Sequence, residues 1–426
     1  MTIQRKNKNK RRISYTAYKI NKCRVCLSDK LKNIISLGNL FLSDFVEKPI
    51  NVKKFPIDLV ICQRCSLVQL KHTTPAKYLY TDRYGYRSGI NETMKRELSD
   101  VVGRALKKIK LEKKDLVIDI GSNDGTLLSN YTKSVTTVGF EPVKKLAQIS
   151  AKKSDYAVND YFNYNSFIRY LPASVSKNKA KIITSIAMFY DLDDPNIFLD
   201  DVVKILDDSG IFIIQQNYLG GMIEQNAFDN ILHEHLEYYS LSSLEYLLDL
   251  HDLKVIDVEE RAINGGSFRV YVTFKSNKNI KESAGLKKLR EKEIKMGLKK
   301  FSTYKKFAKE VGDVSKTIHD FIKNEVKKDK TVYVYGASTR GNTLLQYCNL
   351  DTALITAAVE RNSEKWGKKI ASVGIPIISE EEARRKKPDY MLVLPWFFKE
   401  EFIKREKKYL DNGGHFIFPL PKLTVV

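Results

Sequence analysis

The 426-residue sequence lacks long hydrophobic runs and contains few cysteines, histidines and tryptophans. No run of about 18 apolar residues is present, so we expect no membrane-spanning helix and no membrane partner. Five cysteines and six histidines leave few candidates for metal ligands or for a general base. No secretory signal is recognisable, and charge is distributed along the chain. We therefore expect a cytoplasmic protein, in which disulfides are rare.

Positive charge is plentiful, with a formal net charge of +22 at pH 7. Part of the excess lies in a basic tail at 1–22, and much of the rest is lysine scattered through helix-like segments. A nucleic-acid binder usually gathers its basic residues in one patch. The scattered charge instead indicates a solvated surface, so we expect no nucleic-acid partner and a bias toward anionic substrates.

Four of the five cysteines fall into two Cys-x2-Cys pairs, Cys23 with Cys26 and Cys62 with Cys65. This spacing suits one tetrahedral zinc ion, because each short turn points both sulfurs at a common centre. Two disulfides are the alternative, which a cytoplasmic location disfavours. Four thiolate ligands leave no open coordination position, so we predict a structural rather than a catalytic zinc.

After the cysteine-rich segment, short apolar runs alternate with helical patterns, which is typical of an α/β fold with a parallel sheet covered by helices on both faces. The first unit has such runs at 116–120, 136–140, 182–186 and 210–215. A lysine-rich helical stretch then leads into a second, smaller α/β unit. The domains that we expect are a basic tail at 1–22, a zinc-binding domain at 23–75, a first α/β domain at 76–276, a helical connector at 277–330 and a second α/β domain at 331–426.

The first strand of the first unit leads into a loop with two glycines, Gly121 and Gly125. Ligands bind at the carboxyl ends of strands in open parallel sheets, and glycine lets the backbone approach them closely. The loop resembles motif I of class I S-adenosylmethionine (SAM) methyltransferases, with an ordinary turn as the alternative. The next strand ends at Glu141, where a carboxylate can accept hydrogen bonds from both ribose hydroxyls of an adenosyl group. The candidate cofactor-binding residues are Asp119, Gly121, Ser122, Asn123, Asp124, Gly125, Glu141 and, near the adenine edge, Asn159.

Two further motifs of the first unit carry polar groups suited to catalysis or binding. The segment His233-Glu234-His235 places a base and an acid within three residues. A surface pair of histidines and a metal site are its alternatives. In Gly265-Gly266-Ser267-Phe268-Arg269 the glycines permit close approach, and Arg269 can hold a carboxylate or phosphate. A β-bulge with a paired arginine is the alternative there.

The second unit contains a comparable loop between a strand and a helix, from Gly336 to Asn342. Its backbone amides and Arg340 can cradle a diphosphate at the helix N-terminus. Glu360 and Arg361, at the end of the next strand, lie where a ribose or a base would be contacted. A loop with no ligand is the alternative. The candidate substrate-binding residues are Arg269, Ser338, Arg340, Asn342, Glu360 and Arg361.

Several of these motifs occur in an order that resembles a known family. They are the Cys-x2-Cys pairs, the tyrosine segment 84–89, the loop 121–128, and the segments 233–236, 265–269 and 335–338. Together they resemble the three-domain methyltransferases of nucleotide-sugar metabolism, over about residues 20 to 426 of the chain. The best-understood members are sugar C-3 methyltransferases that act on thymidine-diphosphate 4-keto-6-deoxyhexoses.

The resemblance implies a zinc-binding N-terminal domain, a central class I SAM-methyltransferase domain and a C-terminal Rossmann-like domain that helps to hold a nucleotide-diphosphate sugar. Methylation of a carbon next to a ketone needs a base to form the enolate and a donor near the developing oxyanion. In the family the second histidine of the His-Glu-His motif is the base and the acid before it assists, which carries over to His235 and Glu234. Tyr84 and Tyr86 match the family's tyrosine segment, and either can donate to the keto oxygen. We expect a monomer or a homodimer.

The sequence departs from the family pattern at Leu232, at Ala187-Met188 and at Asn264, where the well-studied members have a tyrosine, an Ala-His pair and a histidine. These differences leave open the sugar and the accepting atom, with carbon favoured over oxygen or nitrogen. Two other hypotheses are a zinc-containing RNA methyltransferase, favoured by the basic charge, and a catalytically silent assembly protein.

Overall fold

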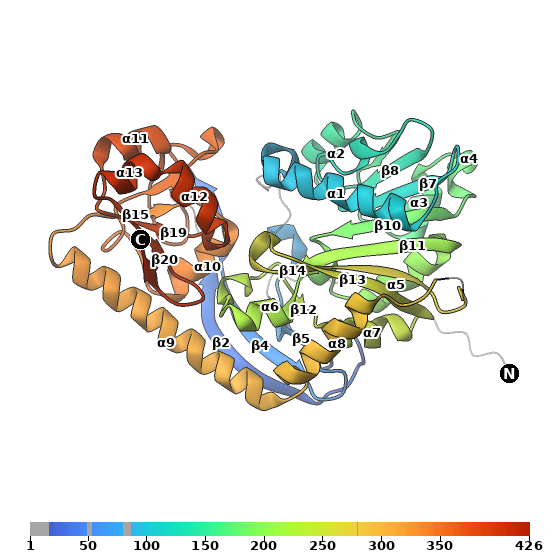
Figure 1. Ribbon diagram of the computed structural model, residues 1–426, viewed down its shortest axis with the longest axis horizontal. Coiled ribbons are helices and arrows are strands. Elements are labelled where there is room, and N and C mark those ends of the chain that lie inside the picture. The colour runs from blue at the N-terminus through green and yellow to red at the C-terminus, as the bar shows by residue number, and fades with distance from the viewer. Residues whose placement is uncertain (1–16, 49–52, 80–86, 279) are drawn as a thin grey trace.

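A computed structural model describes residues 17–48, 53–79, 87–278 and 280–426 (Figure 1). Within these ranges, every helix is too short or too polar to cross a membrane. The chain forms a small N-terminal domain, a central α/β domain and a C-terminal α/β domain. The predicted α/β class with three domains of these types is confirmed.

The N-terminal domain is built around an antiparallel sheet with strand order β12-β5-β4-β2. Its strands are β2 (Leu31–Phe41), β4 (Lys54–Cys62), β5 (Val68–Leu70) and β12 (Glu237–Tyr238), the last contributed by the central domain. Along β4 the apolar side chains of Phe55, Ile57 and Leu59 alternate toward the interior, as expected of a strand with one buried face. Two short ladders are added by β1 (Tyr18–Lys19) with β6 (His72–Thr73), and by β3 (Phe45–Val46) with β17 (Lys369–Ile370). The 3-10 turn η1 (Ala76–Tyr78) closes the domain.

The central domain has a seven-stranded sheet with order β13-β14-β11-β10-β7-β8-β9. Its strands are β7 (Leu116–Ile120), β8 (Thr136–Phe140), β9 (Tyr156–Val158), β10 (Ala180–Ile186), β11 (Leu206–Asn217), β13 (Leu253–Arg261) and β14 (Ser267–Phe274). The ladders from β9 to β11 are parallel, and β14 runs antiparallel to both of its neighbours. Because the middle strands are buried on both faces, β7 reads as a continuous apolar run interrupted only by Asp119.

Helices cover both faces of this sheet. The helices of the central domain are α1 (Glu92–Lys108), α2 (Lys144–Ser150), α3 (Tyr164–Tyr170), α4 (Ala173–Ser176), α5 (Pro195–Ile205), α6 (Leu219–Glu224) and α7 (Leu241–Asp249), of which α6 packs in the cluster shared with the C-terminal domain. The 3-10 turns are η2 (Ser88–Ile90), η3 (Leu128–Asn130), η4 (Phe189–Asp191), η5 (Phe228–Asn230) and η6 (Ile263–Gly265). The apolar stripe of α1, with Leu98, Val101 and Val102, packs on one face of the sheet. Helices α5 and α7 pack on the other face.

The C-terminal domain has a six-stranded sheet with order β18-β16-β15-β19-β20-β21. Its strands are β15 (Val332–Tyr335), β16 (Ala358–Glu360), β18 (Ile377–Ser379), β19 (Tyr390–Val393), β20 (His415–Phe418) and β21 (Thr424–Val425), of which only the last is antiparallel. Helices α8 (Ala284–Met296) and α9 (Phe301–Val326) lead into it. The remaining elements are α10 (Thr339–Tyr347), α11 (Glu380–Lys386), α12 (Lys399–Arg405), α13 (Lys407–Asp411), η7 (Ser363–Lys365) and η8 (Trp396–Phe398).

The N-terminal domain joins the two larger domains through shared cores. Leu37, Ile57 and Leu59 belong to the same apolar cluster as the strands of the C-terminal sheet. Cys23, Cys62 and Leu67 belong to the cluster that lies under one face of the central sheet. Figure 1 shows β2 and β4 between the two α/β domains. This arrangement places the carboxyl ends of the central strands close to the loop that precedes α10.

Candidate active site and zinc site

The four cysteines of the two Cys-x2-Cys pairs lie together. Their sulfur atoms all lie within 4.8 Å of one another, with Cys23 to Cys65 at 3.5 Å and Cys26 to Cys62 at 3.4 Å. Sulfurs at the zinc–thiolate distance of about 2.3 Å would lie roughly 3.8 Å apart in a tetrahedron, so the cluster fits a zinc ion. All four thiols are free of disulfides. Gln69 donates from Nε2 to Cys23 Sγ at 3.2 Å, which further orients this ligand.

The loop after β7 begins with a glycine in the left-handed region, Gly121, at φ +71°. A β-carbon at this position would lie 3.1 Å from Cγ of Met188, which follows β10. Gly125, at φ +73°, would place a β-carbon 2.9 Å from the backbone of Ser150 in α2. Only glycine meets both demands, the backbone conformation and the close approach. Gly121 therefore faces the ends of the neighbouring strands, whereas Gly125 serves packing against α2.

The polar side chains of this loop are held by protein groups. Asn123 accepts from the backbone N–H of Ser88 at 2.9 Å, and Asp124 accepts from that of Gly89 at 3.1 Å, so both tie the loop to η2. Ser122 Oγ lies 3.3 Å from Ser150 Oγ. These contacts make the loop rigid and leave its backbone, rather than these side chains, as the surface that a cofactor would meet.

Two buried carboxyl groups, Asp119 and Glu141, flank the loop. Glu141 accepts from the backbone N–H groups of Asn123 at 2.9 Å and Val143 at 2.8 Å. Burial raises its pKa. Asp119 accepts from Thr184 Oγ1 at 2.6 Å. Burial, with a smaller contribution from the charge of Glu141, raises the pKa of Asp119 to about 7.

Asn159 lies at the outer edge of this site. Its Nδ2 donates to the backbone carbonyls of Glu141 at 2.9 Å and Pro142 at 3.0 Å. The exposed side chain therefore fixes the turn after β8. This position brings Asn159 next to Glu141, and its contact with the adenine edge stays a prediction.

The two histidines of His233-Glu234-His235 have different surroundings. His233 is buried, and its Nε2 donates to the carbonyl of Phe55 in β4 at 3.1 Å. His235 donates from Nδ1 to the carbonyl of Asn230 at 3.0 Å. Because a carbonyl can only accept, Nδ1 of His235 carries the proton and Nε2 keeps its lone pair. The geometry thus distinguishes a histidine that anchors the N-terminal domain from one with an available basic nitrogen.

The ionisation of this segment is shifted toward neutral forms. Burial, and next the positive charge of Arg340, lower the pKa of His235 to about 3. Burial raises the pKa of Glu234 to about 7. At neutral pH the imidazole of His235 is therefore uncharged, as a proton acceptor must be.

The turn η4 connects His235 with the loop after β7. Met188, directly before η4, faces Gly121. Two residues later, the ring of Tyr190 lies 4.3 Å from the ring of His235, centroid to centroid. The histidine and the glycine loop therefore contact opposite ends of one short segment.

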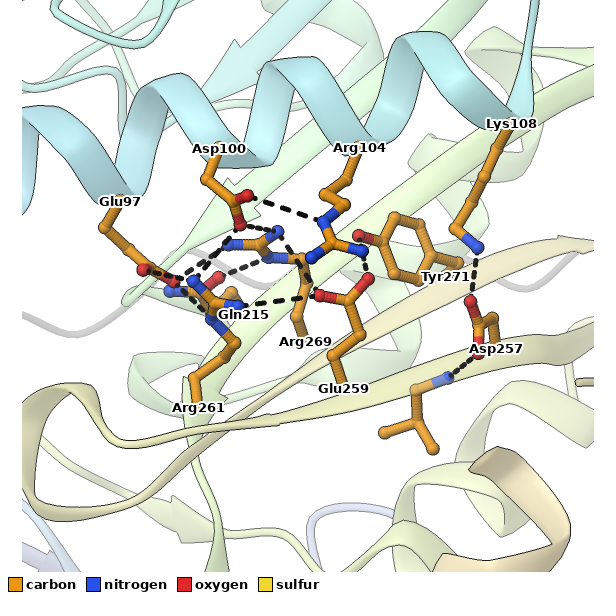
Figure 2. A network of polar contacts seen from close by, with 11 residues as sticks. Glu97, Asp100, Arg104, Lys108, Gln215, Asp257, Glu259, Arg261, Arg269 and Tyr271 are labelled. Atoms are coloured by element: carbon orange, nitrogen blue, oxygen red, sulfur yellow. Dashed lines mark hydrogen bonds and ion pairs between the residues drawn. The ribbon is translucent and has the colours of Figure 1, made fainter. Parts of the chain in front are cut away.

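Arg269 lies away from this junction, inside the sheet-to-helix interface (Figure 2). It is fully buried and donates to Gln215 at 2.6 Å, Asp100 at 2.9 Å and Glu97 at 2.8 Å. Arg261 also pairs with Glu97. Figure 2 shows the guanidinium groups directed at the acids of α1. This placement favours the alternative interpretation, in which a paired arginine attaches α1 to the sheet.

The glycines that precede Arg269 lie where the central and C-terminal domains meet. A β-carbon on Gly265 would lie 3.3 Å from Arg340 Nη2 and from the ring of Trp396. Arg340 donates from Nε at 3.1 Å and from Nη2 at 2.8 Å to Asp229 Oδ2, which also accepts from Trp396 Nε1 at 3.1 Å. Asp229 was not expected from the sequence, because no local motif marks an acid whose partners lie over 100 residues away.

The other predicted substrate-binding residues surround the loop before α10. Ser338 caps the helix by accepting from the N–H of Gly341 at 3.0 Å. Glu360 accepts from the N–H of Ala337 at 3.0 Å, while the neighbouring Arg361 is exposed. Asn342 is buried and donates to Ser43 at 2.9 Å, so its side chain turns toward the N-terminal domain.

Tyr84 and Tyr86 lie outside the described residues. The structure thus brings His235, Arg340, Gly265 and the Gly121 loop to one junction, and places Arg269 and Asn342 elsewhere.

Three known families match successive parts of the chain. A zinc binding domain family matches residues 23–80, a methyltransferase domain family matches 90–258, and the family described as C-methyltransferase C-terminal domain matches 262–421. The C-methyltransferase NovU of Streptomyces niveus is 30% identical over 412 residues, which cover 96% of this chain and 97% of NovU.

Solved structures resemble the chain over a smaller part. A SAM-dependent methyltransferase from Clostridium acetobutylicum is 13% identical and covers 42% of this chain and 91% of its own, with a TM-score of 0.33. The N-methyltransferase NodS from Bradyrhizobium japonicum is 10% identical and covers 43% of this chain and 98% of its own, also with a TM-score of 0.33.

Proposed function

Because this chain belongs to the C-methyltransferase family and is a SAM-dependent methyltransferase with a zinc-binding domain, we propose that it methylates a carbon of a nucleotide-linked deoxy- or keto-sugar, with His235 as the base. The observation that carries this proposal is the position of His235. Its ring lies against Tyr190 of η4, the turn that also borders the Gly121 loop. After burial, the positive charge of Arg340, from the C-terminal domain, contributes most to lowering the pKa of His235.

In this proposal the backbone of the loop from Asp119 to Gly125 holds SAM, and Glu141 accepts hydrogen bonds from its ribose hydroxyls. Each oxygen of Glu141 already accepts one backbone N–H, and each has a further lone pair for a hydroxyl. Asn159 supports the adenine side by fixing the turn beside Glu141. When bound, SAM supplies a methyl group activated by its positively charged sulfur.

The chain's own residues make the acceptor carbon nucleophilic. Nε2 of His235 would take the proton from the carbon next to the keto group. The electron pair left on that carbon would form the new bond to the methyl group as the bond between this methyl and the SAM sulfur breaks, and the electron pair of the broken bond would stay on the sulfur of the departing S-adenosylhomocysteine. Glu234, the residue directly before His235, has a pKa near neutrality and assists the base by accepting or donating a proton. Tyr84 or Tyr86 donates to the developing oxyanion, as the family resemblance implies.

The C-terminal domain holds the nucleotide in this proposal. Arg340 and the amides after Ser338 contact the diphosphate, and Glu360 with Arg361 contacts the nucleoside. A diphosphate beside Arg340 would offset the charge that lowers the pKa of His235, and would thereby strengthen the base. Anion binding and proton removal are then favoured together.

The direct test is incubation of the protein with SAM and a panel of keto- and deoxy-sugar nucleotides, followed by mass spectrometry and NMR of the product. We expect a mass increase of one methyl group and a new methyl signal on carbon. A methoxyl or N-methyl signal would overturn C-methylation, and methylation of RNA but of no sugar nucleotide would overturn the substrate class.

A further inference from the structure

The turn η5 contacts both the C-terminal domain and the proposed base through adjacent residues. Asp229 accepts from Arg340 and Trp396, both of the C-terminal domain. The carbonyl of the next residue, Asn230, accepts from Nδ1 of His235 at 3.0 Å and from the hydroxyl of Tyr238 at 3.3 Å. A displacement of Asp229 must therefore also move the carbonyl oxygen of Asn230, which orients His235.

The side-chain partners of Asp229 come from the C-terminal domain. The residue is 1% exposed, and its Oδ1 has no hydrogen-bond partner in the described part of the chain. All of the side-chain hydrogen bonds that its carboxylate accepts there come from Arg340 and Trp396 through Oδ2. Since a buried carboxylate without a partner is costly, the position of Asp229 is tied to that of these two residues.

The turn has a further contact with each of the two domains. Asn230 Oδ1 accepts from Asn217 Nδ2, at the end of β11, at 3.1 Å. Phe228 packs on Tyr347 of α10 with ring centroids 5.4 Å apart. The turn therefore has little freedom to absorb a shift without moving the carbonyl of Asn230.

We propose that Asp229 is a positioning residue that couples the docking of the C-terminal domain to the orientation of His235. This inference rests on the proposed function, because His235 is the base of that reaction. Asp229 does not itself touch the reacting atoms. It ensures that the base is correctly oriented only when Arg340, the proposed diphosphate anchor, is seated at the domain junction.

The test is NMR of protein with 15N-labelled histidine, with the His235 signals assigned by comparison with His235→Asn. Wild-type protein should show His235 as a single tautomer protonated at Nδ1. Asp229→Asn and Trp396→Phe should each shift these signals or mix the two tautomers, because the first changes the acceptor and the second removes an uncharged donor to it. The second variant also covers the case in which Asp229→Asn does not fold.

Gln346→Leu is the matched control. Gln346 lies on the same helix as Arg340, and its side chain bonds to the backbone of Phe41 in β2, at 2.8 and 3.1 Å, rather than to Asp229 or Asn230 of η5. It should leave the His235 signals unchanged. Wild-type signals in both Asp229→Asn and Trp396→Phe would overturn the coupling, and so would an equal shift in Gln346→Leu.

Turnover gives a second readout. Asp229→Asn should lower kcat by about tenfold or more, as small misplacements of catalytic groups do, and should leave the Kd for SAM unchanged. An unchanged kcat would overturn the inference. The NMR measurement needs no sugar substrate, so a failure of the proposed substrate class would appear in the product assay and not here.

Discussion

The central and C-terminal domains share one loop design and use it differently. In both, the first strand ends at a glycine with positive φ whose N–H pairs with the neighbouring strand, Gly121 with Phe140 at 2.9 Å and Gly336 with Val359 at 2.8 Å. In both, an acid at the end of the second strand, Glu141 or Glu360, accepts from the backbone of that loop.

The difference lies in where the loop side chains go. After Gly121 the polar side chains stay within the central domain, on η2 and α2. After Gly336, two side chains of the loop and helix bond to other domains. Arg340 donates to Asp229 of the central domain, and Asn342 donates to Ser43 of the N-terminal domain. The same backbone motif thus makes its side-chain contacts within one domain in the first case and between domains in the second.

The largest effect is expected from removing the zinc site, because its domain packs on both sheets. Cys62→Ser should lose the metal and unfold the N-terminal domain, since binding energy of a structural zinc is folding energy. Zinc analysis and thermal unfolding measure this. Cys348→Ala, the cysteine outside the cluster, should keep its zinc. Full zinc content and stability in Cys62→Ser would contradict the assignment.

The two glycines test the comparison directly. Gly121→Val should abolish SAM binding, because it strains the backbone and places a side chain where the cofactor would lie. Gly336→Val carries the same strain at φ +89° and a β-carbon 2.9 Å from Pro395, yet it should leave SAM affinity intact. Calorimetric titration with SAM distinguishes them. Equal losses in both variants would show that the two loops do not have separate roles.

The raised pKa of Asp119 predicts that the free energy of unfolding depends on pH. Its raised pKa means that the folded protein retains a proton that the unfolded chain has lost, so stability falls as pH rises from about 4 to about 7. The cost is at most about 4 kcal/mol, because one pKa unit corresponds to about 1.4 kcal/mol. Asp119→Asn should flatten this decline in denaturant unfolding measured from pH 5 to pH 8. A parallel decline in the variant would exclude Asp119 as its source.

The smallest effect is expected from replacing Glu141 or Glu360, the acids at the ends of the second strands. Glu141→Ala should weaken SAM binding by about 1–3 kcal/mol, the range for a hydrogen bond to a charged group. Glu360→Ala should leave SAM binding unchanged and raise the KM for the sugar nucleotide. The two variants together define which domain holds which ligand, and a loss of SAM affinity in Glu360→Ala would contradict the division.

Features of the fold and the site that are set by residues close together in the sequence were predictable from the sequence. Alternating apolar runs indicated both sheets, and the cysteine spacing indicated the zinc cluster. The order of strand, glycine loop and acid placed Glu141 beside the loop after Asp119.

Contacts between distant segments were not predictable in this way. Arg269 pairs with Glu97 and Asp100 of α1, and Asp229 pairs with Arg340, across separations that no local spacing encodes. Asn342 turns toward Ser43 for the same reason. Sequence motifs therefore predicted candidate reacting groups, whereas the long-range contacts around these groups required the structure.

The most direct measurement of the proposed reaction is solvent exchange at the carbon next to the keto group. Enzyme and a keto-sugar nucleotide are incubated in deuterated water without SAM, and deuterium at that carbon is followed by NMR. If His235 removes the proton, wild-type protein catalyses the exchange, and His235→Asn slows it by about 10² to 10⁴, the usual range for general-base catalysis. Exchange in His235→Asn at the wild-type rate would contradict His235 as the base.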